Sequence, residues 1–435
     1  MTQLRTLIAA LAILLVTAAC GKSEDSISAV PDTGSNDLLA YVPADTPYLA
    51  ANLEPIPENV LDSYLAKAQP VLDAMQDQLS QARQNMESGE NAGTADPSEK
   101  VAHALLSEFD GNLNRAGLEG MGFDLRAHKV VYGVGAFPVV RLGLSDANAL
   151  RATVLRVLEN ADVSAPELDY QGVSYWKVSD DDSSEVPAGL YISILEDHVA
   201  FGILPMVAEA ELLPAFLGLD MPAQNDARNR LASLNQAHGY TPYGTGILKT
   251  HDLIDALVQP DSLVGRAMAS STHESHSPLT PECISEIHGL ADNAPRMTMG
   301  VRELTENLVA MQYRLETPES LAGQLMGLVS EIPMVDALSG KIVEFAFGLK
   351  FGPVRDFLVE KATAITTNPY QCEHLAKLND QAAEGLAKMG QPMPPFLNNF
   401  RGIRVSLTEY TMGREAIPEN ARGHLALHVE QPQML

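Results

Sequence analysis

The chain has 435 residues, of which 46% are hydrophobic, and its 29 Lys and Arg against 56 Asp and Glu give a net charge of −27. This excess of anions argues against nucleic acid as a partner, because binding to phosphates requires clustered cations. It argues equally against an electrostatic attachment to anionic lipid headgroups. The length is sufficient for two domains, each with a hydrophobic core of its own.

The first twenty residues have the features of an export signal. Arg5 precedes an apolar run from Leu7 to Val16, and small residues come directly before Cys20. The run is too short for a helix that spans a bilayer, which needs about 20 apolar residues. The segment resembles the bacterial lipoprotein signal, although Thr17 stands where that family more often has Leu or Val.

This resemblance implies that residues 1–19 are a signal peptide and that Cys20 becomes a lipidated N-terminus. Two or three acyl chains would hold the protein on a membrane, whereas a single chain binds only reversibly. In the sorting pattern of such lipoproteins an Asp after the cysteine favours the inner membrane, so Gly21 implies the periplasmic face of the outer membrane. Residues 20–37 are rich in Ser, Asp and Gly without periodicity, which predicts a flexible tether.

Four segments share the same order of predicted elements: a short apolar strand, then a polar residue or a proline, then an amphipathic helix. They are Tyr48–Leu65, Pro138–Leu158, Tyr243–Val258 and Leu308–Val329. Ser145 and Thr317 are candidate N-caps for two of the helices. We interpret the segments as repeated strand-then-helix units; the alternative is that strand-to-helix junctions share these residues for local reasons.

Hairpin patterns between these units predict the fold class. The runs Ala188–Leu204 and Met297–Leu315 each hold two apolar strands around a short polar turn. Strands joined by short turns are antiparallel, so we expect an α+β fold with antiparallel or mixed sheets and helices packed on one face. Longer helices are predicted at 56–86, 98–118, 334–366 and 371–389.

The chain is predicted to form two α+β domains, at 38–270 and 280–435. The segment between them, around 270–281, is polar and lacks apolar periodicity. The end of the chain should contribute a strand to the second domain. We expect Leu425, Leu427 and Val429 to be buried in a sheet and paired with the strand Arg404–Tyr410.

Besides Cys20 the chain has two cysteines, Cys283 and Cys372. An isolated pair in an exported protein favours one disulfide, because the periplasm is oxidising. Two free buried thiols are the alternative. A redox-active pair is disfavoured, since the chain has no C-x-x-C motif.

Two polar clusters and one apolar stretch are weak candidates for sites. His273 and His276, with Glu282 and His288 nearby, are metal-ligand types, but their spacing is not that of a zinc motif and a solvated loop explains them better. The acidic run 180–185 is interpreted as a charged hairpin turn rather than a Ca²⁺ loop. The apolar stretch Leu321–Ala362 is interrupted by charges, which favours core helices over a groove for an acyl chain or membrane insertion.

No catalytic or nucleotide-binding motif is present, and no cofactor is expected. The run VVYGVGAFPVVRLGLSDANALRA (130–152) and the strand-then-helix units resemble uncharacterised bacterial lipoproteins of unknown function. The resemblance implies a fold but gives no site residues. The sequence therefore favours a non-enzymatic binding or scaffolding module with a periplasmic protein or a hydrophobic ligand as partner. A carrier of a lipid or other hydrophobic ligand, and a hydrolase with dispersed catalytic residues, are the alternatives.

Overall fold

The computed structural model describes residues 36–69, 72, 76, 80, 97–162, 165–179, 188–270, 279–332, 343–390, 394–412, 418–431 and 433. It divides into two compact units. Unit 1 contains the chain up to Leu279 together with Pro295–Glu316, and unit 2 contains Thr280–Ala294 together with the chain from Thr317 onward. Helices and antiparallel sheets occur in both, which confirms the predicted α+β class.

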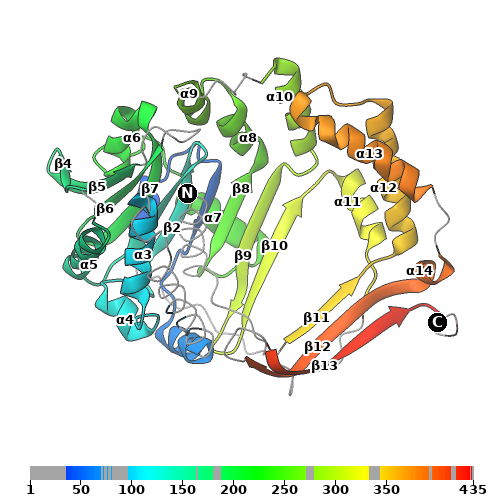
Figure 1. Cartoon of the computed structure of the whole chain (residues 1–435), viewed down its shortest axis with the longest axis horizontal. Helices are drawn as coiled ribbons and strands as arrows, with labels where there is room; N and C mark the ends of the chain where they lie inside the picture. Colours follow the sequence, from blue (N-terminus) through cyan, green and yellow to red (C-terminus); the bar gives the residue numbers. More distant parts are fainter. Residues whose placement is uncertain are drawn as a thin grey trace, which may run out of the picture. The chain divides into compact units, whose positions relative to one another are not determined.

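Unit 1 is built on a ten-stranded sheet in the order β10-β9-β8-β1-β2-β3-β7-β6-β5-β4 (Figure 1). Its strands are β1 (Tyr48–Ala51), β2 (Lys129–Val134), β3 (Phe137–Gly143), β4 (Leu168–Tyr170), β5 (Val173–Ser179), β6 (Ala188–Ile194), β7 (His198–Pro205), β8 (Thr245–Lys249), β9 (Arg296–Leu304) and β10 (Val309–Glu316). All the pairings described in this sheet are antiparallel, as expected for strands joined by short turns.

Helices pack on both faces of this sheet, and not on one face as the sequence suggested. On the first face the helices η1 (Asp37–Tyr41), α6 (Glu209–Phe216) and α7 (Ala227–His238) contribute to a core with alternate residues of β1, β2, β3 and β7. On the second face α5 (Ala147–Asn160) packs with Leu150 against Leu142, Val199 and the fully buried Trp176. Strands buried on both faces show little alternation between apolar and polar residues, so the sequence could not reveal the second helical layer.

The start of α5 illustrates how local chemistry fixes these elements. Asp146, and not the expected Ser145, is the N-cap, and its carboxylate accepts hydrogen bonds from the backbone N–H groups of Asn148 and Ala149 at 2.9 and 3.0 Å. These bonds satisfy donors that have no partner inside the helix. The helix also contacts α3 (Pro97–Phe109), where the Arg156 guanidinium is 2.9 Å from the Glu108 carboxylate.

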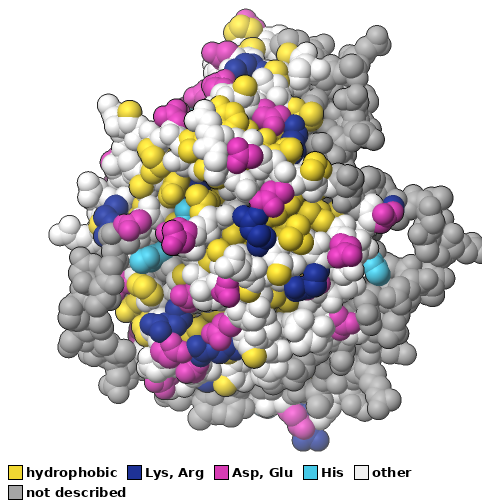
Figure 2. Space-filling view, turned by 90° about the vertical axis from the view of Figure 1, so that its left-hand side faces the viewer, with side chains coloured by type: hydrophobic (Ala, Val, Ile, Leu, Met, Phe, Trp, Pro, Cys, Tyr) yellow, Lys and Arg dark blue, Asp and Glu magenta, His cyan; other side chains and the backbone are white. Residues whose placement is uncertain are grey.

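Ion pairs also hold the surface of unit 1 together. Arg115 of α4 (Arg115–Gly120) pairs with Glu119 at 2.7 Å and with Glu58 and Asp62 of the helix at 58–69. Figure 2 shows the result on this side of the molecule, where basic and acidic side chains lie next to one another and separate small hydrophobic areas. On the described part of this face, positive and negative side chains therefore largely cancel each other's electrostatic potential.

Unit 2 contains the three-stranded antiparallel sheet β11-β12-β13 and most of the later helices. Its elements are α10 (Pro281–Ala291), α11 (Glu319–Leu328), β11 (Val343–Gly348), α12 (Phe351–Thr367), η3 (Glu373–Leu375), α13 (Ala376–Met389), α14 (Pro395–Asn399), β12 (Phe400–Met412) and β13 (Pro418–Val429). The helix expected at 334–366 is wrong in its first part, because β11 lies within it. In VEFAFG the aromatic residues alternate with smaller ones, which is the period of a strand.

The C-terminal strand is paired as expected but is not buried. Leu425 pairs with Val405 and Leu427 with Ile403 in the β12–β13 ladder. Leu425 is 68% exposed and Leu427 is 54% exposed, so the predicted burial is wrong. β13 is the last strand of its sheet, and an edge strand has a neighbour on one side only.

The hairpin of β9 and β10 belongs to unit 1, which differs from the expected boundary at 270–280. β9 pairs with β8 from Lys249↔Arg296 to Thr245↔Gly300, so the chain returns to the first sheet after α10. The border between Leu279 of unit 1 and Thr280 of unit 2 falls within the segment 270–281, most of which lies outside the described residues. The sequence did not indicate that residues 295–316 belong to unit 1, because pairing between strands that are distant in the chain leaves no local pattern.

Candidate ligand-binding pocket

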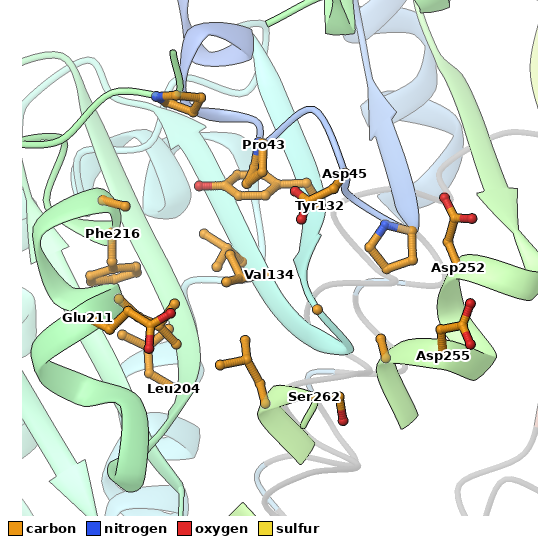
Figure 3. Close-up of a pocket in the computed structure, with 18 of the residues that line it drawn as sticks. Pro43, Asp45, Tyr132, Val134, Leu204, Glu211, Phe216, Asp252, Asp255 and Ser262 are labelled. Carbon is orange, nitrogen blue, oxygen red and sulfur yellow. The ribbon is translucent and has the colours of Figure 1, made fainter. Parts of the chain in front are cut away.

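A cavity of about 550 Å³ opens on the first face of the sheet in unit 1. Its lining comes from the loop after η1, from β2, β3 and β7, and from three helices: α6, α8 (Thr250–Val258) and α9 (Leu263–Ala269). Figure 3 shows Phe216 and Leu204 on one side and Asp252 and Asp255 across the cavity from them. The size falls within the range that suits small-molecule ligands, about 300–1,000 Å³.

The apolar part of the lining is aromatic and aliphatic. It includes Tyr41, Tyr132, Val134, Val139, Leu204 and Phe216. Tyr132, Val139, Leu204 and Phe216 also belong to the core of this face, so the same side chains that stabilise the fold form the wall of the cavity. A wall supported by a packed core is preformed and needs little reordering on binding.

One buried cation holds the three aromatic side chains of this wall. The Arg141 guanidinium is fully buried and lies 3.8 Å from the centroid of the Tyr41 ring. It donates to the Tyr132 hydroxyl oxygen at 3.2 Å and to the Phe216 carbonyl oxygen at 2.6 Å. Among the described residues no carboxylate pairs with Arg141, so these neutral acceptors and the ring replace its hydration.

The third acceptor of Arg141 is a buried histidine. The Arg141 Nη1–H donates to His198 Nε2 at 2.9 Å, which requires the proton of the neutral ring to be on Nδ1. That Nδ1–H lies 2.7 Å from the carboxylate of Asp197. The pair has the residue types of a catalytic dyad, but Nε2 already accepts a hydrogen bond and the ring is 2% exposed. His198 therefore serves as a buried hydrogen-bond acceptor for Arg141.

Burial lowers the pKa of His198 below its ordinary value, and the charge of Arg141 acts in the same direction, while the hydrogen bond to Asp197 opposes both. In the unfolded chain this imidazole takes up a proton near pH 6.5, but in the folded protein it does so only at lower pH. The unfolded state thus binds more protons below about pH 6.5. The stability that neutral His198 contributes is present above this pH and is lost as the pH falls through the folded pKa.

We therefore expect unit 1 to lose up to about 1.4 kcal/mol of stability per pH unit through His198 below pH 6.5. His198→Gln should be less stable than the parent at pH 7.5 but should show a shallower loss down to pH 5. Denaturant unfolding followed by Trp176 fluorescence measures both, since Trp176 is the only tryptophan and is buried in unit 1. His374→Gln, at an exposed position of unit 2, is the control. Equal slopes for His198→Gln and the parent would refute the assignment.

Five carboxylates form the other part of the lining: Asp45, Glu211, Asp252, Asp255 and Asp261. One cation, Arg266, lines the cavity with them, and it is 3.1 Å from Glu211. Asp252 is paired with Lys249 at 2.8 Å, and Asp255 accepts a hydrogen bond from Gln259 at 2.9 Å. The lining therefore carries an excess of negative charge next to an apolar wall.

The sequence did not identify this pocket, because its lining residues come from four stretches of the chain: 41–47, 132–139, 204–222 and 252–266. A partial signal was present in α8, where Asp252 and Asp255 are three residues apart and so lie on one face of the helix. Cys20, His273 and His276 and the acidic run 180–185 lie outside the described residues. Glu282 and His288 lie on α10 in unit 2, and in the described ranges no group of three or more His, Cys, Asp or Glu could hold a metal ion.

Cys283 and Cys372 lie together in unit 2, with their Cα atoms 4.5 Å apart, within the span of a disulfide. Across residues 36–433, as far as they are described, no helix is long and apolar enough to span a bilayer. Comparison with known proteins gives no identity: no family model, no curated protein and no solved structure matches this chain.

Proposed function

We propose that the protein is an exported, lipid-anchored binding protein whose pocket in unit 1 takes a small ligand with an apolar body and a cationic group. The observation that carries this proposal is the combination of a cavity of about 550 Å³ with an aromatic wall and five carboxylates. A cavity of this size, with a wall that belongs to the packed core, is of the kind that suits small-molecule ligands.

The charges of the lining set the preferred ligand class. Carboxylates grouped around a cleft with low-dielectric walls raise the local concentration of cations. Arg266 does not reverse this, since it is paired with Glu211. On the apolar side, the half-buried Tyr41 offers aromatic surface, and a cation beside an aromatic ring gains about 0.5–2 kcal/mol.

Three probes with the same ring and different charge test the proposal: benzyltrimethylammonium, benzyl alcohol and benzoate. We expect calorimetry to give the tightest binding for the cation and the weakest for benzoate. Asp252→Asn/Asp255→Asn should weaken binding of the cation by roughly tenfold or more and leave benzyl alcohol unchanged. Glu384→Gln is the matched control, because this carboxylate lies in unit 2 and pairs with Lys388.

Equal binding of the three probes, or an unchanged affinity of the double variant, would show that the carboxylates do not select the ligand. Native mass spectrometry of the mature protein supplies an independent observation, because a tightly held ligand remains bound during purification. Retention of anionic small molecules in the pocket would count against the proposal.

The proposed place of action is the periplasmic face of the outer membrane, by way of acyl chains on Cys20. Support comes from the signal at residues 1–19 and from Gly21 after the cysteine. Cys20→Ser is expected to release the protein from the membrane fraction or to leave the precursor unprocessed. Normal processing with unchanged membrane association would disprove the anchor, and fractionation with immunoblotting distinguishes these outcomes.

A further inference from the structure

The second face of the ten-stranded sheet has an apolar groove of its own. Two hollows of about 160 and 190 Å³ adjoin there and share Ala50, Val131 and Met299 as lining residues. Val131 precedes Tyr132 in β2, and neighbouring residues of a strand point to opposite faces. The groove therefore lies across the sheet from the pocket lined by Tyr132.

The strand register explains why this face is hollow. One row of paired residues crosses five strands, from Val131 in β2 through Ala50 and Gly246 to Met299 and Tyr313 in β10. The small residues Ala50 and Gly246 stand in the middle of this row. Because their side chains project little from the sheet, the surface is recessed there. A Cβ atom on Gly246 would lie 2.8 Å from Cε of Met299, which shows how closely the methionine lies over this position.

The groove is long, apolar and open at one end. Four steps between neighbouring strands separate β2 from β10, which is about 19 Å at 4.8 Å per step. Met297, Met299 and Met311 line it, and methionine adapts its shape to varied apolar partners. Tyr313 and Leu315 of β10 face the same side and are 61% and 57% exposed.

One cation stands at the other end of the groove. Lys129 lines the first hollow and lies two residues before Val131, on the same face of β2. Its ammonium makes no ion pair and no side-chain hydrogen bond within the part of the chain that the structure describes. Burial lowers the pKa of Lys129, and the charge of Asp124 only partly offsets this effect. A half-buried ammonium without a partner is unfavourable, and an anion beside it would relieve that cost.

We propose that this groove binds a long-chain fatty acid, with its carboxylate paired to Lys129 and its chain crossing β1, β8 and β9 toward Tyr313. The occupant follows from charge complementarity: a single cation at the inner end of an apolar groove matches a ligand with one anionic end and an unbranched apolar body. This site is independent of the pocket proposed above, whose carboxylates would repel the same ligand.

Hexadecanoate and hexadecanol test the proposal, each measured by displacement of a fluorescent fatty acid from the full mature protein. The parent should bind hexadecanoate more tightly than hexadecanol. Lys129→Gln should weaken hexadecanoate binding by roughly tenfold or more while hexadecanol binding stays constant, since a hydrogen bond to a charged group is worth about 1.5–3 kcal/mol. Lys100→Gln is the control, because this lysine lies on α3 with Asp162 as an exposed partner at 3.9 Å.

Ala50→Phe fills the middle of the groove and should abolish binding of both probes. Trp176 fluorescence and denaturant unfolding establish that this variant folds, and Met299→Ala, which widens the groove, should keep both probes bound. Absence of hexadecanoate binding by the parent, equal affinity for the acid and the alcohol, or insensitivity to Lys129→Gln would each overturn the assignment. Benzyltrimethylammonium binding by Ala50→Phe reports separately on the pocket of the first face.

Discussion

Replacing Arg141 by Met is expected to lower the free energy of unfolding of unit 1 by about 3–5 kcal/mol. Met retains most of the volume but leaves the Tyr132 hydroxyl, His198 Nε2 and the Phe216 carbonyl without the donor that they share. Each buried polar group that loses its partner costs about 1–3 kcal/mol, reduced where the group can reorient. Guanidinium chloride unfolding followed by Trp176 fluorescence measures this loss.

The same substitution should also weaken ligand binding in the pocket, because Tyr41, Tyr132 and Phe216 all contact Arg141 and all line the cavity. Arg156→Met is the control: the Arg156 side chain is 52% exposed in its ion pair with Glu108, and pairs at the protein surface contribute about 0–1 kcal/mol. A loss below about 1 kcal/mol for Arg141→Met would mean that the three acceptors find other donors.

Removing the bond between Cys283 and Cys372 is expected to destabilise unit 2 by about 2–5 kcal/mol, because the bond closes a loop across a sequence separation of 89 residues. Cys283→Ala/Cys372→Ala should show this loss as an earlier unfolding transition by circular dichroism. Non-reducing peptide mapping of the parent establishes that the two cysteines are joined. Finding both thiols free in the protein purified without reductant would disprove the disulfide.

Trp176 supplies an internal reference for that experiment, since it lies in unit 1 and the cysteines lie in unit 2. The double variant should leave the Trp176 transition in place. Glu286 adds a second link at the same point, where its carboxylate accepts hydrogen bonds from the backbone N–H groups of Gln371 and Cys372 at 2.8 and 2.9 Å. Glu286→Gln should therefore destabilise unit 2 further in the double variant than in the parent.

The sequence was most informative where structure depends on neighbouring residues. The start of α10 depends on such local chemistry: Pro281 stands in its first turn, and Thr280 accepts a hydrogen bond from the Cys283 N–H at 3.2 Å. The hairpin of β6 and β7 could be placed from two apolar runs around Glu196 and Asp197. Both signals lie within a few residues along the chain.

What the sequence could not supply depends on contacts between distant residues. Arg141 stands in an apolar strand and looks like a solvent-facing charge, yet it is fully buried because Tyr132, His198 and Phe216 surround it. Lys129 and Met299 are 170 positions apart in the sequence. They line the same groove because the sheet order β9-β8-β1-β2 brings their strands to within three neighbouring steps of each other. Register across a sheet is a tertiary property, so neither site has a local pattern.

The return of the chain to unit 1 at Pro295 has a consequence for the order in which the parts of the protein fold. The last two strands of the first sheet, β9 and β10, follow α10 in the chain, and α10 belongs to unit 2. They are therefore synthesised after the first helix of unit 2. Until β9 is available, the edge of β8 opposite β1 has no neighbour, and an open apolar edge can pair with other chains. A fragment that stops at Leu279 should therefore aggregate, and a chaperone would be most useful to this protein during the interval between the synthesis of β8 and that of β9.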